Sequence, residues 1–221
     1  MSYLSIPLFN VYEPLDDSDS YLLIIKNKQL LYYFLQNYNY NTNEEYIKVF
    51  DESNNQIKTM DYIDIVTSIL SIDVNTKKNI NALVRQLKTN TDILKKTSLN
   101  VTNIVKETFG VIKMDSPIDI ISDINISEED IIKMMDINID ECSNTMIERL
   151  NNYVKVSYEL RNVRVFIFYN LLSFLTETEI ELLIHNSKYS NIKIIDIEYF
   201  DDGSYIFDHK KIVDKDICLL E

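Results

Sequence analysis

The chain has 221 residues, of which 46% are apolar, enough for one domain or one domain with a subdomain around a hydrophobic core. Its two cysteines, Cys142 and Cys218, exclude a disulfide-based scaffold, and the lack of both an apolar run of about 18 residues and a secretory signal predicts a cytoplasmic protein without a membrane span. The formal net charge of −13, taken alone, argues against binding to nucleic acid, because acidic surfaces repel phosphates.

The first sixty residues are predicted to form strands and one helix of an α/β sheet. Apolar residues predict strands at residues 3–9 and 21–25, and helical spacing of apolar residues predicts a helix at residues 30–37. Residues 45–52 alternate apolar with polar side chains, which predicts a further strand.

The junction between the second strand and the helix contains no glycine. Nucleotide-binding α/β proteins carry a phosphate loop at such a junction, with two glycines and a following lysine. The whole chain has only Gly110 and Gly203, and Lys26 and Lys28 make a poor phosphate site without backbone amides aimed at the phosphates. The sequence therefore predicts a nucleotide-type architecture that lacks the means to hold a nucleotide.

From residue 61 to about residue 155, apolar residues recur at three- and four-residue steps, which predicts a series of helices. A break in this pattern leaves Asn75 or Thr76 to cap the helix that follows. Gly110 is predicted to end the helical pattern as a C-cap, and a later helix is expected at residues 140–160.

The C-terminal part returns to strand patterns. Residues 163–170 are apolar at nearly every position, which is typical of a parallel strand covered on both faces, and residues 191–199 are predicted to form another buried strand. A helix that begins after Thr176 separates them, so the segment predicts a right-handed strand–helix–strand unit. Residues 211–220 are predicted to add an edge strand.

The predicted fold class is α/β, with a head domain built from both ends of the chain and an extended α-helical insertion between them. The expected boundaries are residues 1–60 and 156–221 for the head and residues 61–155 for the insertion. No internal repeat or low-complexity linker is visible in the sequence.

One segment is basic in an otherwise acidic chain. Residues 75–106 contain seven basic residues and one acidic residue, a net charge of +6, whereas every other part of the chain is net negative. A solvated helix face and a surface for nucleic acid both fit this pattern. The seven basic residues are Lys77, Lys78, Arg85, Lys88, Lys95, Lys96 and Lys106.

A second segment, residues 115–141, is rich in carboxylates and includes a helix expected at residues 127–136, with Ser127 as N-cap and Asp130 at the capping-box position. Clusters of oxygen ligands suit calcium, but the glycine of an EF-hand loop is missing. Acidic residues near the beginnings of two successive helices would give the same pattern without a metal. The carboxylates are Asp115, Asp119, Asp123, Glu128, Glu129, Asp130, Asp136, Asp140 and Glu141.

Three stretches resemble the small accessory protein of type II-A CRISPR loci, a family that works in spacer acquisition beside the large RNA-guided nuclease. They are "IPLFNVYEPL" near the start, "IVTSILSIDVN" at residues 65–75 and "RVFIFYNLLSFLTETEIELL" at residues 164–183. The resemblance extends over about residues 5–215, with matching order and spacing.

This resemblance implies a head similar to the sheet of P-loop NTPases, without a working phosphate loop, and an inserted helical leg. It also implies a homotetrameric ring with a basic inner surface that takes in double-stranded DNA ends and is held by calcium near the hinge between head and leg. Other CRISPR adaptation proteins and the RNA-guided nuclease are the expected partners. No catalytic activity is expected.

The resemblance favours DNA for the basic segment and calcium for the acidic one. The expected DNA contacts are Lys77, Lys78, Arg85, Lys88, Lys95 and Lys96, with Lys26, Lys28, Lys48 and Lys58 of the head as alternatives. The expected calcium ligands are Asp123, Glu128 and Asp130, with Asp119 and Asn125 as second choices.

An enzyme is the competing hypothesis, as a degenerate NTPase or a metal-dependent nuclease that uses the acidic segment. A two-metal nuclease needs carboxylates that converge on a shared metal site. The acidic residues lie mostly in a predicted helical segment, away from the predicted strands, which disfavours this hypothesis.

Overall fold

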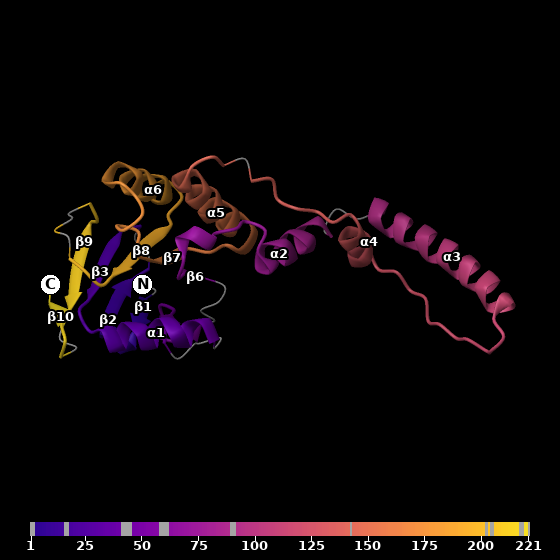
Figure 1. Cartoon of the computed structure of the whole chain (residues 1–221), viewed down its shortest axis with the longest axis horizontal. Helices are drawn as coiled ribbons and strands as arrows, with labels where there is room; N and C mark the ends of the chain where they lie inside the picture. Colours follow the sequence, from indigo (N-terminus) through magenta and orange to yellow (C-terminus); the bar gives the residue numbers. More distant parts are fainter. Residues whose placement is uncertain are drawn as a thin grey trace. The chain divides into compact units, whose positions relative to one another are not determined.

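The structure is a computed structural model, and it describes residues 3–15, 18–40, 46–57, 62–88, 92–141, 143–201, 203, 206–216 and 219–220. The chain divides into two compact units (Figure 1). The first, called the α/β unit, consists of residues 1–74 and 141–221, and the second, called the helical unit, consists of residues 75–140.

A six-stranded sheet forms the centre of the α/β unit, in the order β10-β9-β3-β8-β7-β6 among the described residues. All neighbouring pairs are parallel except β10 with β9, which is antiparallel. Every residue of β3 and β8 is buried, as expected for strands covered on both faces. The strands are β3 (Tyr21–Ile25), β6 (Ile63–Val66), β7 (Val165–Tyr169), β8 (Lys193–Glu198), β9 (His209–Val213) and β10 (Leu219–Leu220).

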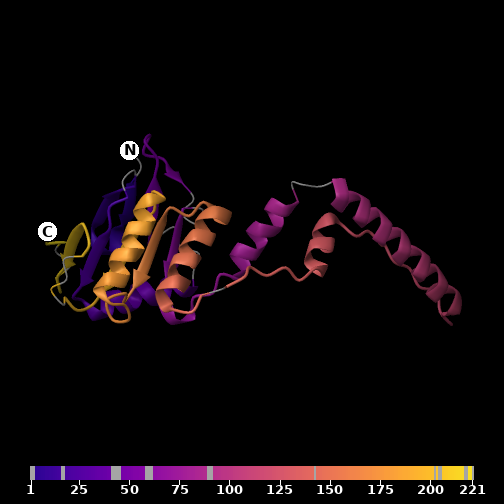
Figure 2. The same cartoon turned by 90° about the horizontal axis from the view of Figure 1, so that it is seen from above.

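Helices cover both faces of this sheet. Helix α1 (Lys28–Tyr40) lies on one face, and α5 (Met146–Arg161) and α6 (Glu177–Tyr189) lie on the other (Figures 1 and 2). Thr176 caps α6 as predicted, because its hydroxyl accepts a hydrogen bond from the backbone N–H of Glu179, whose carboxylate accepts one in return.

A smaller antiparallel sheet, with the order β2-β1-β4-β5, covers α1 and completes the core. Phe34 of α1 packs against Phe9, with ring centroids 4.9 Å apart. The strand predicted at residues 3–9 is shorter than expected, because Pro7 starts a 3-10 turn over Pro7–Phe9. The strands are β1 (Tyr3–Ile6), β2 (Val11–Pro14), β4 (Lys48–Phe50) and β5 (Gln56–Ile57).

The described part of the helical unit holds α2 (Lys77–Leu87), α3 (Asp92–Asp115) and α4 (Glu128–Met134). Thr76 caps α2, and Ser127 and Asp130 form the predicted capping box of α4. Gly110 was predicted to end its helix, and this prediction is wrong. It lies inside α3, which continues for five residues beyond it.

Side chain-to-backbone hydrogen bonds hold the helical unit together. The side-chain amide of Asn75 accepts a hydrogen bond from the N–H of Ile139 (2.7 Å) and donates one to its carbonyl (3.1 Å), so the first and last parts of the unit are joined. Ser98 donates to the carbonyl of Ile126 (2.5 Å), and Thr102 accepts from the Ile126 N–H (3.1 Å). Helix α3 therefore packs through small polar side chains on the segment that precedes α4.

The helical unit is smaller than the insertion predicted at residues 61–155. Residues 63–66 were expected to be helical but form β6, because they pair with β7 in the large sheet. At the other end α5 belongs to the α/β unit, where it packs against α6. No described helix is both long enough and apolar enough to cross a membrane.

A buried charged network ties α5 to β6. The Asp64 carboxylate, on the edge strand, accepts a hydrogen bond from the Tyr153 hydroxyl (2.7 Å) and pairs with the Arg161 guanidinium. Burial, and then the charge of Asp64, raise the pKa of the Tyr153 hydroxyl well above its ordinary value, so Tyr153 remains a proton donor in this network.

We expect Asp64→Ala to lower the free energy of unfolding by about 3–5 kcal/mol, because it leaves the Arg161 charge buried without its carboxylate. Urea unfolding followed by circular dichroism measures this loss. The matched control is Asp19→Ala, whose ion pair with His209 is 45% exposed on both sides and should contribute less than about 1 kcal/mol. Equal losses in the two variants would contradict a special role for the buried network.

Candidate nucleic-acid interface and strand-end pocket

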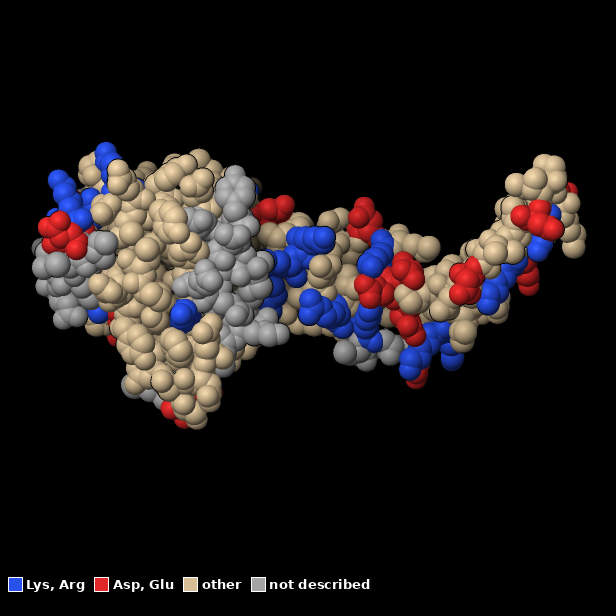
Figure 3. All heavy atoms as spheres, turned by 90° about the horizontal axis from the view of Figure 1, so that it is seen from below, with Lys and Arg blue, Asp and Glu red and all other residues tan. Residues whose placement is uncertain are grey.

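Helix α2 presents its basic residues to solvent. Its inner face buries Asn79, Ala82 and Val84, and this burial fixes the opposite face outwards. Lys77, Lys78 and Arg85 are all exposed. Figure 3 shows basic side chains gathered on the helical unit, with acidic side chains among them.

Lys88, at the end of α2, differs from the other predicted DNA contacts because it is already in an ion pair. Its ammonium group contacts the Glu129 carboxylate of α4, which also pairs with Lys133 at 2.8 Å. Hydrogen bonds from Lys133 and Lys88 lower the pKa of Glu129 to about 2, so this carboxylate stays charged near neutral pH. The bridge between α2 and α4 offsets part of the charge of Lys88.

Three of the lysines of α3 share one side of that helix. Lys95, Lys106 and Lys113 follow one another at steps of 11 and 7 residues, which places them within about 20° of each other around the helix axis. All three are exposed, as is Lys96. The charge analysis of residues 75–106 missed Lys113 because this lysine lies beyond the segment, although the helical spacing includes it.

A different side of α3 is apolar and exposed. It follows the alternating three- and four-residue spacing of a coiled coil, in which the residues at both steps face a partner helix. Exposed fractions of 62% for both Ile104 and Val111 show that the described chain leaves the C-terminal half of this side largely uncovered, whereas the N-terminal half is half-buried. The seam, defined by these positions, consists of Leu94, Thr97, Val101, Ile104, Thr108 and Val111.

The structure does not bring the five predicted calcium ligands together. The Asp130 carboxylate accepts hydrogen bonds from the N–H and hydroxyl of Ser127, which lower its pKa. Glu128 lies beside a cavity of about 260 Å³ that Lys88 and Lys95 also line. The remaining three ligands are exposed on the irregular segment before α4: Asp119, Asp123 and Asn125.

No group of three or more His, Cys, Asp or Glu residues within the described ranges is arranged to hold a metal ion. The interpretation of these acids as helix-capping residues fits Asp130 directly, since it closes the capping box of α4. Calcium binding by these residues therefore stays a prediction.

The alternative lysines of the head that the structure describes lie on different elements. Lys48 lies on β4 of the small sheet, whereas Lys26 and Lys28 lie at the junction between β3 and α1 of the large sheet. Lys28 extends over the ring of Tyr199, with its Nζ 4.9 Å from the ring centroid. Lys58 lies outside the described residues.

Asn27 occupies the place at which a phosphate loop would cradle its ligand. Its side-chain oxygen accepts a hydrogen bond from the N–H of Leu30 (3.0 Å), and its amide donates to the carbonyl of Lys215 (3.1 Å). A backbone N–H at the beginning of α1 is thus satisfied by the chain itself.

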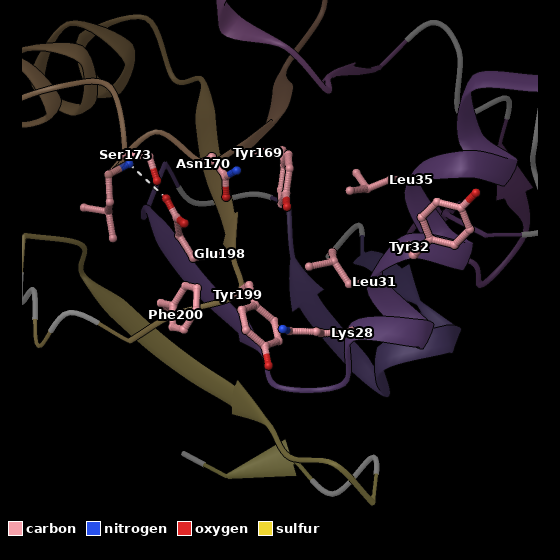
Figure 4. A pocket seen from close by; sticks show the side chains of 11 residues that line it. Lys28, Leu31, Tyr32, Leu35, Tyr169, Asn170, Ser173, Glu198, Tyr199 and Phe200 are labelled. Carbon is pink, nitrogen blue, oxygen red and sulfur yellow. Dashed lines mark hydrogen bonds between the residues drawn. The ribbon is translucent and has the colours of Figure 1, made fainter.

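A pocket of about 500 Å³ opens next to this junction (Figure 4). It lies at the carboxyl ends of β7 and β8, and α1 forms its other wall. Its lining combines aromatic rings with a few polar groups. The lining residues are Lys28, Leu31, Tyr32, Leu35, Tyr169, Asn170, Leu172, Ser173, Glu198, Tyr199 and Phe200.

Two acidic residues of β8 lie behind and beside this pocket. Asp196 is fully buried and accepts a hydrogen bond from the N–H of Leu171 (3.2 Å), while Glu198 accepts one from the N–H of Leu172 (2.9 Å). Burial, and then the charge of Glu198, raise the pKa of Asp196 well above its ordinary value. Sequence analysis missed this pair, although two acids in the apolar run "KIIDIE" were visible.

The chain matches the profile of one protein family over residues 39–217, and that family is described as CRISPR-associated protein (Cas_Csn2). A CRISPR-associated protein Csn2 from Enterococcus faecalis is 22% identical over 189 residues, which cover 84% of this chain and 85% of that protein. A crystal structure of Stu0660 of Streptococcus thermophilus has a TM-score of 0.57 at 14% identity and covers 97% of this chain and 74% of that one. At this identity the structural likeness bears on the fold alone.

We expect the buried carboxyl of Asp196 to reduce stability as the pH rises. Its pKa is raised in the folded state, so above the unfolded value of about 3.9 the folded state binds more protons than the unfolded state, and stability falls until the pH passes the folded pKa. In Asp196→Asn this fall should be absent, because the amide cannot ionise. Urea unfolding at a series of pH values from 4 to 8 measures the difference.

Asp208→Asn provides a control of opposite sign. The pKa of Asp208 is lowered to about 2 in the folded state, where Lys188 and Ser20 donate hydrogen bonds to its carboxylate. Its contribution to the free energy of unfolding is present above the unfolded pKa of about 3.9 and is lost only as the pH falls towards 2, so this variant should show the same change between pH 4 and 8 as the wild type. A wild-type stability that does not fall between pH 4 and 8 relative to Asp196→Asn would contradict a raised pKa at Asp196.

Proposed function

Because the chain belongs to the Csn2 family of CRISPR-associated proteins, we propose that it is a non-catalytic protein that binds double-stranded DNA, at its ends, during the acquisition of CRISPR spacers. The observation that carries this proposal is the outward-facing basic surface of α2 and α3 in a chain with a net charge of −13. The acidic remainder repels phosphates, which leaves the helical unit as the surface for DNA. Other adaptation proteins and the RNA-guided nuclease are the proposed partners.

The chemistry of this surface suits the DNA backbone rather than particular bases. Lysine ammonium groups at exposed helix positions meet phosphates as point charges and carry no sequence information. Binding should therefore be independent of sequence and should weaken steeply with salt, because each neutralised phosphate releases counterions. Lys88 contributes less than its neighbours in this proposal, since Glu129 already offsets its charge.

We further propose that the chain forms a homotetrameric ring through the seam of α3. A helix that packs its small polar side on its own chain and leaves its apolar seam exposed favours burial of that seam against another copy. Four copies would bring four basic surfaces around one duplex, so many weak phosphate contacts would act together.

The proposed role requires no chemistry in the α/β unit. Asn27 satisfies the beginning of α1, so the junction that would bind phosphates in an NTPase is used for structure. Calcium binding stays a prediction: the residues expected to bind it are separate in one chain, and we assign no ligand among them.

We expect the triple variant Lys77→Glu/Lys78→Glu/Arg85→Glu to lose retention of linear duplex DNA in a gel shift. If each residue meets one phosphate, the slope of log affinity against log salt should become shallower by about 3 × 0.9, and affinity at 0.1 M salt should fall by about 100-fold or more. Circular DNA of the same sequence should bind less than linear DNA if ends are required.

The matched control is Lys26→Glu/Lys155→Glu/Lys215→Glu, which changes the net charge equally through exposed residues of the α/β unit. Its affinity should fall by much less than that of the helical-unit variant. An equal loss would mean that only net charge matters, and a loss confined to the control would place the DNA surface on the α/β unit.

We expect Ile104→Glu/Val111→Glu to convert the assembly to monomers in sedimentation velocity at micromolar concentration, because charges would then lie in the seam. The fold should persist, since both side chains are already mostly exposed in one chain. The control Leu99→Glu/Asn103→Glu changes two exposed residues of the same helix outside the seam and should leave the assembly intact.

Monomeric wild-type protein would contradict the proposed ring. Repeating the sedimentation runs with calcium and with a chelator tests the calcium prediction. If the sedimentation coefficient is the same with calcium and with chelator, calcium has no part in the assembly, while the proposed contact through the seam stands.

A further inference from the structure

The proposed DNA role leaves the strand-end pocket beside α1 without a ligand. We propose that this pocket binds a nucleobase through its ring and its polar edge, presented either by a free nucleoside or by an unpaired base at a DNA strand end. The shared chemistry is a planar heterocycle that carries both hydrogen-bond donors and acceptors. The pocket is separate from the basic surface of the helical unit, so the inference does not rest on DNA binding there.

The position of the pocket favours a small-molecule ligand. Helix α1 follows β3 on one face of the parallel sheet, and α6 follows β7 on the opposite face (Figures 1 and 2). Open parallel sheets bind ligands at the carboxyl ends of their strands where the connections diverge in this way. A volume of about 500 Å³ accommodates a base with its sugar and is far larger than a metal ion requires.

The walls of the pocket suit a flat ring. Tyr169 and Tyr199 line its interior, and the exposed rings of Tyr32 and Phe200 add to its lining (Figure 4). The rings of Tyr199 and Phe200 stand nearly perpendicular at 83°, with centroids 4.6 Å apart, and Lys28 covers one face of Tyr199, which leaves the exposed ring of Phe200 as a face on which a base can stack. Bases stack on such rings irrespective of their identity, because every base has a π face.

The polar groups of the pocket supply a donor and an acceptor from opposite walls. Lys28 on α1 is a donor, and the Glu198 carboxylate on β8 is an acceptor (Figure 4). The hydrogen bond from the Leu172 N–H fixes the Glu198 carboxylate, which has acceptor capacity for more than one donor. A nucleobase carries donor and acceptor groups on one edge, which a hydrocarbon ring lacks.

Glu198 lies close to Asp196. Burial, and then the charge of Glu198, raise the pKa of Asp196, and of these two acids Glu198 is the one that lines the pocket. An exocyclic amino group of a base would donate to the Glu198 carboxylate. Adenine, guanine and cytosine have such a group and thymine does not.

The site has no phosphate cradle. Asn27 already satisfies the Leu30 N–H at the beginning of α1, the junction has no glycine, and the charge of Glu198 opposes the attraction of an anion to Lys28. The site therefore differs from a nucleotide pocket, because affinity should come from the base and should not rise from nucleoside to triphosphate.

The experiment is saturation-transfer NMR with the full-length protein and adenosine, cytidine, thymidine, ribose or ATP as probes. Adenosine and cytidine should bind saturably and more tightly than thymidine, ribose should not bind, and ATP should bind no more tightly than adenosine. Phe200→Ala, a change at a side chain that is 75% exposed, should weaken adenosine binding at least several-fold without affecting folding. Glu198→Gln should remove the preference for adenosine over thymidine.

Two comparisons separate the source of the base from the DNA proposal. A duplex with one unpaired nucleotide at each end should bind more tightly than a blunt duplex, and Phe200→Ala should abolish this difference, if a strand end is the source. Equal binding of both duplexes with nucleoside binding intact would assign the site to free nucleosides. Nucleoside binding should persist in Lys77→Glu/Lys78→Glu/Arg85→Glu.

Failure of all nucleosides to bind would overturn the inference while leaving the proposed DNA role untouched. Binding that neither Phe200→Ala nor Glu198→Gln weakens or alters in preference would also overturn it, because the ligand would then occupy a different place.

Discussion

The parallel pairing of β3 between β8 and β9 is the constraint on which the rest of the structure depends. Residues 21–25 come from the beginning of the chain, yet both neighbouring strands come from its last thirty residues. All five residues of β3 are buried, so the strand has no solvent-facing side and depends on its neighbours on both faces. The α/β unit must therefore assemble from both ends of the chain, and the helical unit is necessarily an insertion between them.

The two sides of α3 illustrate how one helix can serve two purposes. Inside its own chain it uses Ser98 and Thr102, small side chains that allow close approach and bond the backbone of Ile126. Its seam leaves the apolar side chains of Ile104 and Val111 largely exposed, and three of its lysines lie along another side. If α3 packed on α4 through its apolar side chains, the seam would be buried within the chain and would not be exposed to a partner.

The buried strands were the most predictable part of the fold. Residues 165–169 form a continuous apolar run that a doubly covered sheet explains, and Thr176 carries the capping signature of α6. In contrast, β6 has only four residues and merges into a helix-like spacing that continues beyond it. Its strand conformation depends on pairing with β7, about a hundred residues later, which no local pattern reveals. The helix end predicted at Gly110 was wrong because helix interiors tolerate glycine at modest cost.

The candidate sites were less predictable than the fold, because spacing does not show which partners a side chain already has. Asp130 and Glu129 fit a metal cluster by sequence, but Ser127 and the lysines around Glu129 engage them locally. The carboxylates of β8, in contrast, were not predicted as site residues. Their importance comes from burial beside a pocket whose other wall is α1, from the far end of the chain.

The paired hydrogen bonds between Asn75 and Ile139 have a kinetic and evolutionary consequence. Without them, β6 and β7 could pair only by closing a loop that contains the entire helical unit, and the entropy of that closure grows with loop length. Once Asn75 and Ile139 are joined, the remaining loop between β6 and β7 is short, irrespective of the length of chain between these two residues. Helices could then be lengthened, shortened or exchanged above this junction with little effect on the folding rate of the sheet.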